Sequence, residues 1–379
     1  MAKKKRIVDT SSIRQNTPLF KLPKTIPNPV LEKKKHSTKY LLIVFIALAV
    51  LTFIALNIAL FDKKIEAIPT CGDGTFYNTC SLDKPYFCEE GILVEKASIC
   101  GCPKFLPKKE GNFCISEYNK NPIKISLNYF LRGQEREIPF IAYESINNYV
   151  SNISRVVINY EEEVPFRSDF KQKAIGDEMQ REFLLPLVKK IQNFAPSDKV
   201  EQARIAISLV QNIPYGSPQK KTSFGGVEVD YSKYPYEVLY DNEGICGEKS
   251  QLLAFILKEL GYGVSIFYFS EENHEAVGIQ CPLDESFYGS GYCFVETGGS
   301  AIITDFSMEF TSGIKLRSRP EIILISEGIS LPNNIYEYKD AETLNNIRER
   351  NLLGIFNLWR FSKIKEKYNL LEVYIQNNN

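Results

Sequence analysis

A single uncharged apolar segment constrains this chain more than any other feature of its sequence. Residues 40–61 read YLLIVFIALAVLTFIALNIALF and contain no charged side chain over 22 positions. As a helix, such a segment is about 33 Å long, which is enough to cross a hydrocarbon core of roughly 30 Å. A helix buried in a soluble core is seldom apolar on every face over this length. We therefore predict one transmembrane helix at 40–61 and a chain divided between two compartments.

The charges on either side of this segment predict its orientation. Residues 1–39 carry 11 Lys and Arg against two acids, whereas the residues beyond the segment carry 35 bases and 44 acids. The positive-inside rule places the proline-containing basic arm, predicted to be disordered, in the cytoplasm and the remainder outside. A cleaved signal peptide, the alternative, has an apolar core of about 7–15 residues before a small-residue cleavage site. The longer segment favours an uncleaved signal anchor in the cell membrane.

Cysteine usage agrees with an extracytoplasmic location. No cysteine precedes residue 71, and the predicted module at 62–118 holds six: Cys71, Cys80, Cys88, Cys100, Cys102 and Cys114. Zinc modules usually offer paired C-x2-C knuckles or histidines, and neither is found here. An even count outside the membrane predicts three disulfides that stabilise a small module, a spacer or recognition element, and leaves all fifteen connectivities open.

The rest of the chain has the composition of a globular ectodomain with a net negative charge, which argues against nucleic acid as a partner. Its periodicity indicates both helices and strands. We predict a mixed strand and helix part at 119–198, a core at 199–310, and a C-terminal strand and long helix at 311–379 that pack on the core. Within these parts we expect strands at 123–131 and 137–142, and helices at 170–194, 199–212 and 341–368.

One cysteine stands at the predicted start of an apolar helix. Gly244 and Gly247 flank Cys246, and a run of leucines, isoleucines and phenylalanines follows until Gly261, which is expected to end the helix in a left-handed conformation. Unpaired N–H groups and the helix dipole in a first turn stabilise a thiolate, which is the nucleophilic form of cysteine. A small buried core residue is the alternative interpretation of Cys246.

A histidine and an acid follow on predicted strands. His36 lies on the cytoplasmic side, so His274 is the imidazole available to the ectodomain as a general base. If the strand starting at His274 pairs antiparallel with 292–297 so that His274 and Glu296 share a face, alternation places Cys281 and Cys293 together on the other face. A disulfide between those two would leave Cys246 as the single unpaired cysteine.

Several segments carry a resemblance to a known superfamily. LVQNIPY (209–215), YPYEVLYDNEGICGEKS (234–250), NHEAVGIQ (273–280) and YCFVET (292–297) are similar to transglutaminase-like proteins, particularly their microbial membrane-associated branch. The similarity covers residues 203–307, with a looser similarity back toward residue 120. It implies a papain-related α+β core in which the cysteine begins a helix and the histidine and acid lie on antiparallel strands.

The resemblance also implies roles for individual residues. Cys246 is expected to be the nucleophile, His274 the base and Glu296 the third member, where the family usually has Asp; Asp305 is a reserve for that role. Gln211, or a backbone N–H near Cys246, is expected to support the oxyanion. The implied chemistry requires no metal or other cofactor.

The function implied is acyl transfer on the amide bonds of a protein or peptide substrate through a thioester on the cysteine. We expect hydrolysis, as by a protease or amidase, rather than transamidation, because water needs no dedicated acceptor site. The alternative is a catalytically inactive transglutaminase-like envelope scaffold that binds a partner. Nothing in the sequence indicates the oligomeric state.

Overall fold

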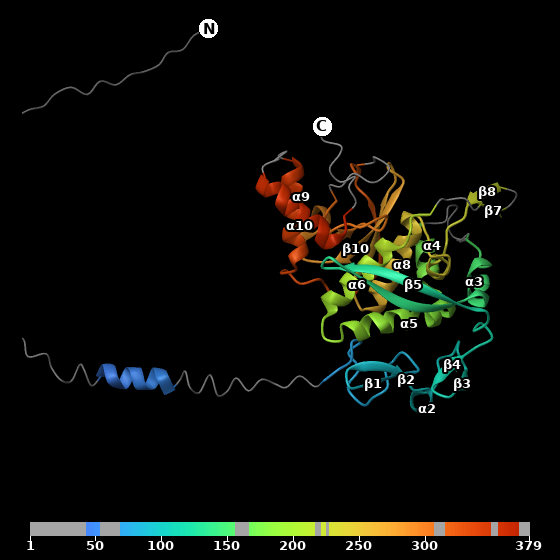
Figure 1. Ribbon diagram of the computed structural model, residues 1–379, viewed down its shortest axis with the longest axis horizontal. Helices are drawn as coiled ribbons and strands as arrows, with labels where there is room; N and C mark the ends of the chain where they lie inside the picture. Colours follow the sequence, from blue (N-terminus) through green and yellow to red (C-terminus); the bar gives the residue numbers. More distant parts are fainter. Residues whose placement is uncertain are drawn as a thin grey trace, which may run out of the picture. The chain divides into compact units, whose positions relative to one another are not determined.

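The computed structural model describes residues 43–53, 69–155, 167–216, 221–224, 227–306, 315–349 and 355–370. The chain divides into two compact units, Met1–Ala67 and Ile68–Asn379. In the first unit, residues 43–53 form a helix with exposed apolar side chains (Figure 1). The rest of the predicted span at 40–61, and the basic arm before it, lie outside the described residues. Among the residues that are described, no helix combines the length and apolar character needed to cross a membrane.

Three disulfides hold together the first part of the second unit, in agreement with the even cysteine count. Two hairpins, β1 (Tyr86–Glu89) with β2 (Ile92–Glu95) and β3 (Lys108–Glu110) with β4 (Phe113–Ile115), flank a short helix α2 (Ala97–Cys100). The apolar core of the first hairpin is small, so the covalent bonds supply stability that burial alone would not. The bonds join Cys71 to Cys88, Cys80 to Cys100, and Cys102 to Cys114.

This disulfide module is packed against helix α5 (Glu178–Phe194) of the main body. Asn193 at the end of α5 accepts a hydrogen bond from Leu93 N at 2.7 Å and donates one to Leu93 O at 2.9 Å. A Cβ on Gly72 would lie only 2.4 Å from the carbonyl oxygen of Gln192, so the two backbones are in close contact. The module is therefore in direct contact with the main body through α5.

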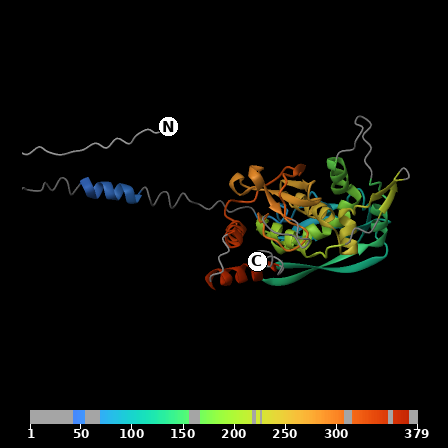
Figure 2. The same cartoon turned by 90° about the horizontal axis from the view of Figure 1, so that it is seen from above.

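A long hairpin lies along one side of the body. Strands β5 (Pro122–Leu131) and β6 (Gln134–Tyr143) pair over their full lengths, which confirms and extends the two predicted strands. Alternate residues of β5, among them Leu127 and Tyr129, are buried against helix α6. Helix α3 (Glu144–Ser151) follows. The tip of the hairpin lies beside the C-terminal helix α10, where Gly133 N donates to Lys367 O at 3.0 Å (Figures 1 and 2).

The helix predicted at 170–194 is in fact two helices. Helix α4 (Arg167–Gly176) ends before Asp177, whose carboxylate accepts a hydrogen bond from Gln180 N at 2.8 Å and starts α5. The prediction was wrong because apolar periodicity continues through the junction and hides the N-cap. Helix α6 (Lys199–Asn212) begins as predicted, with Asp198 accepting a hydrogen bond from Glu201 N at 2.9 Å.

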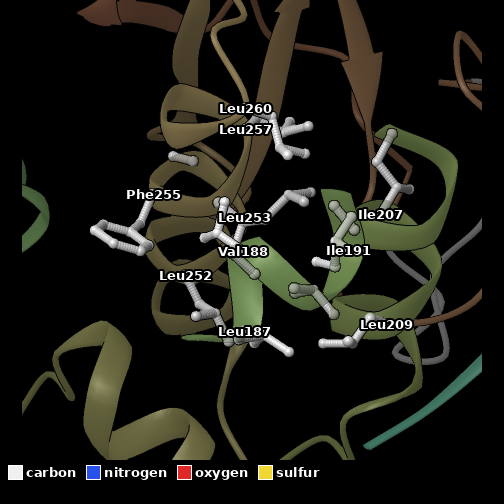
Figure 3. Packing of buried hydrophobic residues seen from close by; sticks show 14 of the residues in the cluster. Leu187, Val188, Ile191, Ile207, Leu209, Leu252, Leu253, Phe255, Leu257 and Leu260 are labelled. Atoms are coloured by element: carbon white, nitrogen blue, oxygen red, sulfur yellow. The ribbon is translucent and has the colours of Figure 1, made fainter. Parts of the chain in front are cut away.

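Helix α8 (Cys246–Glu259) lies at the centre of the apolar core. Its leucines, including Leu252 and Leu253, pack against Val188 and Ile191 of α5 and Ile207 of α6 (Figure 3). Gly261 follows the helix with φ of +93°, as predicted for a left-handed residue after a helix end. The short helix α7 (Pro235–Asp241) and the β7 (Lys221–Phe224) and β8 (Val227–Asp230) hairpin precede α8. Because α8 is buried on nearly all sides, its first residue, Cys246, is held in a fixed position.

A four-stranded antiparallel sheet covers α8. Its order is β11 (Tyr292–Val295), β10 (His274–Gln280), β9 (Val264–Phe269) and β12 (Glu321–Ser326). One face packs on α8 through residues such as Ile266 and Val277, while Phe267 and Phe294 belong to an aromatic cluster on the other face. Two antiparallel strands therefore bring the predicted histidine and acid to the start of α8.

The C-terminal helix predicted at 341–368 is also two helices, α9 (Tyr336–Glu349) and α10 (Ile355–Tyr368). They pack on the body and on each other through one apolar cluster that includes Ile302, Leu344 and Phe361. A single straight helix could not bury both segments on that cluster.

Candidate active site

The first residue of α8 is Cys246, and local hydrogen bonds fix the chain that leads into it. Glu248 accepts from Ile245 N at 3.0 Å and from Lys233 N at 2.8 Å. Gly244 pairs with the loop after α6, donating to Pro214 O at 3.2 Å. Because Cys246 occupies the first turn, its neighbouring N–H groups have no partners inside the helix and favour a negative charge on its sulfur.

The histidine and the acid meet on one face of the sheet. The register pairs Val277 with Val295, so Glu296 comes opposite Ala276, two positions from His274 on the same face. His274 Nε2 lies 2.9 Å from Glu296 Oε2. Glu296 Oε1 accepts a second hydrogen bond, from Gly298 N at 2.6 Å, and its side chain is fully buried.

The opposite face carries a disulfide, as the alternation of side chains requires. Cys281 is bonded to Cys293, which is the pairing predicted from parity. All nine cysteines lie within the described residues, and Cys246 is the free one. The count of six in the module, two in the sheet and one unpaired is confirmed.

Cys246 and His274 are electrically coupled. Burial raises the pKa of the Cys246 thiol. The hydrogen bond with His274, the positive charge of His274 and the N–H of Glu275 together lower this pKa by more than burial raises it, so the net shift is downward. Burial lowers the pKa of His274, yet the Glu296 carboxylate and the Cys246 sulfur raise it to about 10. The two shifts favour a thiolate beside an imidazolium, with Glu296 behind the ring.

Tyr215 is a further member of the site that the sequence did not single out. Its hydroxyl interacts with both the backbone and the side chain of Cys246. Burial and the neighbouring sulfur raise the pKa of Tyr215 to about 12, so the hydroxyl stays protonated and remains a donor. Tyr215 ends the LVQNIPY segment, and its pairing with Gly244 across two loops is a tertiary contact that no periodic pattern reveals.

Gln211 has a different role from the predicted one. Its side-chain amide donates to Glu296 O at 2.9 Å and to Ala301 O at 3.1 Å, so both of its hydrogens are already used. These bonds hold the loop that carries the acid. The expectation that Gln211 supports an oxyanion is wrong, because no N–H of its amide is left to donate.

Asp305 also lies in a different environment from the predicted reserve position. Its buried carboxylate forms a two-pronged ion pair with Arg348 of α9, at 2.6 and 3.0 Å. The carboxylate that contacts His274 is Glu296. Asp305 therefore connects the C-terminal helices to the body, and its charge is matched by Arg348.

Lys249, one turn after Cys246, is fully buried beneath the site. Its ammonium donates to two backbone carbonyls, Gln211 O near the end of α6 at 3.3 Å and Ile213 O just after the helix at 2.6 Å. Burial lowers its pKa to about 8, against the opposing effects of Glu296 and Cys246. Lys249 thus joins α8 to the segment that leads to Tyr215.

Two hydroxyl groups connect the loop that carries Glu296 to Cys246. Thr297 Oγ1 donates to Cys246 O at 3.2 Å, and Ser250 Oγ lies 2.9 Å from the same threonine oxygen. Movement of the loop that holds Glu296 would therefore also disturb the first turn of α8. Within the described ranges, no group of three or more His, Cys, Asp or Glu side chains is arranged to hold a metal ion.

Comparisons with known proteins add two distant likenesses. No protein-family model and no curated protein matches the chain. Among solved structures, Legionella pneumophila LapG has 16% sequence identity over 35% of this chain and 73% of its own, with a TM-score of 0.22. Its calcium-bound form has 15% identity over 47% and 98%, with a TM-score of 0.24. Both TM-scores are below 0.5, so the chemistry of the site has to be inferred from its own geometry.

Proposed function

We propose that this chain is a membrane-anchored, extracytoplasmic cysteine enzyme of the transglutaminase-like type that acts on amide bonds of proteins or peptides. The observation that carries the proposal is His274, whose ring contacts the Cys246 sulfur on one side and lies 2.9 Å from the Glu296 carboxylate on the other. A nucleophile, a base and a group that orients the base are the three parts that covalent acyl transfer needs.

The first half-reaction forms a thioester. The Cys246 thiolate adds to the substrate carbonyl carbon, and the carbonyl oxygen becomes an oxyanion. The N–H of Cys246 and the hydroxyl of Tyr215, which now contact each other and the sulfur, are the donors placed to receive that charge. When the C–N bond breaks, the His274 imidazolium gives its proton to the leaving nitrogen, and the neutral imidazole remains hydrogen-bonded to Glu296.

The second half-reaction releases the acyl group. His274 takes a proton from water, the oxygen adds to the thioester carbonyl, and the collapse of this adduct expels the Cys246 thiolate. The product is a carboxylic acid, and the imidazolium is restored. A lysine amine in place of water would give transamidation; we favour hydrolysis because water requires no acceptor groove.

The proposed location depends on charge and cysteine chemistry. The basic arm at 1–39 and the apolar segment at 40–61 place the N-terminus in the cytoplasm under the positive-inside rule. Four disulfides between residues 71 and 293 favour an oxidising compartment for everything that follows.

The test is alkylation of Cys246 by iodoacetamide between pH 4 and 10, followed by mass spectrometry of the native full-length protein. A thiolate paired with an imidazolium should react with a midpoint below about 8.5, the ordinary value for cysteine. In His274→Ala the midpoint should rise, because burial then acts on the thiol without the hydrogen bond and positive charge of His274.

Cys246→Ser is the control that assigns the label to this residue. An ordinary midpoint in the wild-type protein, or one that His274→Ala leaves unchanged, would contradict the proposed pair. That result would favour the inactive scaffold.

A further inference from the structure

A cavity of about 340 Å³ opens beside the nucleophile. Its wall includes Cys246, Arg155, Arg167, Lys171, Tyr268 and Glu275. This volume lies in the range of pockets that hold small ligands or single side chains. Because it begins at the reacting sulfur, a substrate attached at Cys246 would place a neighbouring side chain in it.

Two of the charged residues in this cavity already have their polar atoms held by other groups. Arg155 is nearly fully buried, forms an ion pair with Glu237 and donates to the backbone oxygens of Val150, Ile153 and Ser232. Glu248 accepts from two backbone N–H groups at the start of α8. Neither is available to select a substrate by charge.

The remaining three charges do not balance. The Glu275 carboxylate is held by two cations, Lys171 Nζ at 2.6 Å and Arg167 Nη1 at 3.3 Å. Lys171 is buried and its contact is short, so Glu275 is matched mainly by the lysine. One positive charge is left over, and it is on Arg167.

Arg167 has the geometry of a group that can bind an anion. Its guanidinium lies 3.5 Å from the ring centre of Tyr268, which fixes its plane, and its side chain is 42% exposed. Within the part of the chain that the structure describes, its one hydrogen bond is the long contact to Glu275. A planar guanidinium with free N–H groups is well suited to a carboxylate, which it can bind through two parallel hydrogen bonds.

We propose that this pocket selects substrates with an acidic side chain, Asp or Glu, next to the scissile amide bond, and that Arg167 is the residue that recognises it. The inference rests on the proposed function. Bound in this way, the acid would pair with Arg167, while a lysine at the same position would meet the two cations Arg167 and Lys171. An uncharged glutamine would fill the space without the ion pair.

The experiment measures how well capped tripeptides protect Cys246 of the full-length protein from iodoacetamide. Ac-Ala-Glu-Ala-NH2 and Ac-Ala-Gln-Ala-NH2 have nearly the same size, and the side chain of the first is its only carboxylate. Half-protection should need about fivefold less of the Glu peptide, the size of effect expected of a partly exposed ion pair. Arg167→Gln should abolish the difference, and Arg167→Lys should retain part of it.

A matched control separates local recognition from net charge. Arg136→Gln removes an arginine from the exposed hairpin strand β6, outside the pocket, and should keep the wild-type preference. The inference is overturned if the Glu peptide protects no better than the Gln peptide, or if its advantage survives Arg167→Gln. In either case labelling of Cys246 at a low pH midpoint would still support the proposed function, whereas a wild-type protein that does not label contradicts both.

Discussion

At the scale of single residues, the site depends on the buried carboxylate behind the imidazole. Glu296 contributes the largest effect that raises the pKa of His274, to about 10 against an ordinary value near 6.5. Because the carboxylate favours the protonated ring, its removal must lower that pKa. As the pH rises, the imidazolium would then lose its proton at a lower pH than in the wild-type protein. The ion pair with Cys246 would be lost at the same point.

Glu296→Gln should therefore lower the pKa of His274 by at least about one unit. The chain has two histidines, so the NMR titration of the ring protons of His274 can be followed in full-length protein with His36→Gln as background. Asp305→Asn is the control: it should leave that titration unchanged and cost about 3 kcal/mol of stability, because it breaks a buried ion pair with Arg348. A histidine that responds to Asp305→Asn and not to Glu296→Gln would make Asp305 the third member.

The residues that could be predicted from the sequence are those whose position follows from a count or from alternation. Cys246 was the unpaired cysteine in an odd total. With His274 and Glu296 assumed to share a face, alternation of side chains placed Cys281 and Cys293 together on the other. Tyr215, Lys249 and Arg167 could not be predicted, since each acts through a contact between elements far apart in the chain. Gln211 was placed near the site correctly, but the atoms that its amide contacts depend on the path of a loop.

At the scale of elements, strand β10 is packed on both of its faces, against α8 on one and against the aromatic cluster on the other. Gly278 lies in this strand between α8 and the aromatic cluster, and a Cβ there would be 2.3 Å from Ser265 Oγ and 2.9 Å from Phe267 Cζ. Both neighbours are fully buried, so neither can move away freely. The glycine allows the sheet to close around the residues that hold His274.

Gly278→Ala should accordingly destabilise the protein by about 2 kcal/mol. Gly176→Ala is the matched control, because a Cβ at the end of α4 meets nothing within 4 Å and should change stability by less than about 0.5 kcal/mol. Urea unfolding of the full-length protein in detergent, followed by tyrosine fluorescence, measures both. Equal midpoints for the two variants would show that β10 can shift to accept a side chain.

Elements were predicted well where one physical signal dominated. The β5–β6 hairpin and α6 followed from alternation and an N-cap, and α8 followed from its apolar run between glycines. The errors occurred where two helices share one continuous apolar pattern, at Asp177 and between α9 and α10. Periodicity reports which residues are buried, and it does not report where the axis of a helix changes direction.

At the scale of the whole molecule, the disulfide module and the main body form one unit through charged contacts as well as backbone contacts. Lys189 of α5 is buried and donates to Asp83 of the module at 2.7 Å, and Arg181 bridges the same aspartate to Glu259 at the end of α8. Burial raises the pKa of Asp83, but Lys189 and Arg181 lower this pKa by a larger amount, so the net shift is downward. The module therefore supports the helix that begins at the nucleophile.

The proposed topology predicts which side of the membrane Cys246 faces. A membrane-impermeant maleimide added to intact cells should label the full-length protein without permeabilisation, because the free thiol lies beyond the apolar segment. Cys246→Ser should remove the label. A wild-type protein that is labelled only after the cells are permeabilised would place the site in the cytoplasm.

The single free cysteine also has a practical meaning. Eight of the nine cysteines are held in disulfides, so one molecule of correctly oxidised protein contains one titratable thiol. A thiol titre of one per chain then reports the concentration of intact sites before any substrate is known. A preparation with a lower titre contains chains whose nucleophile has been oxidised or captured by another cysteine, and its specific activity should be expressed per thiol, not per milligram.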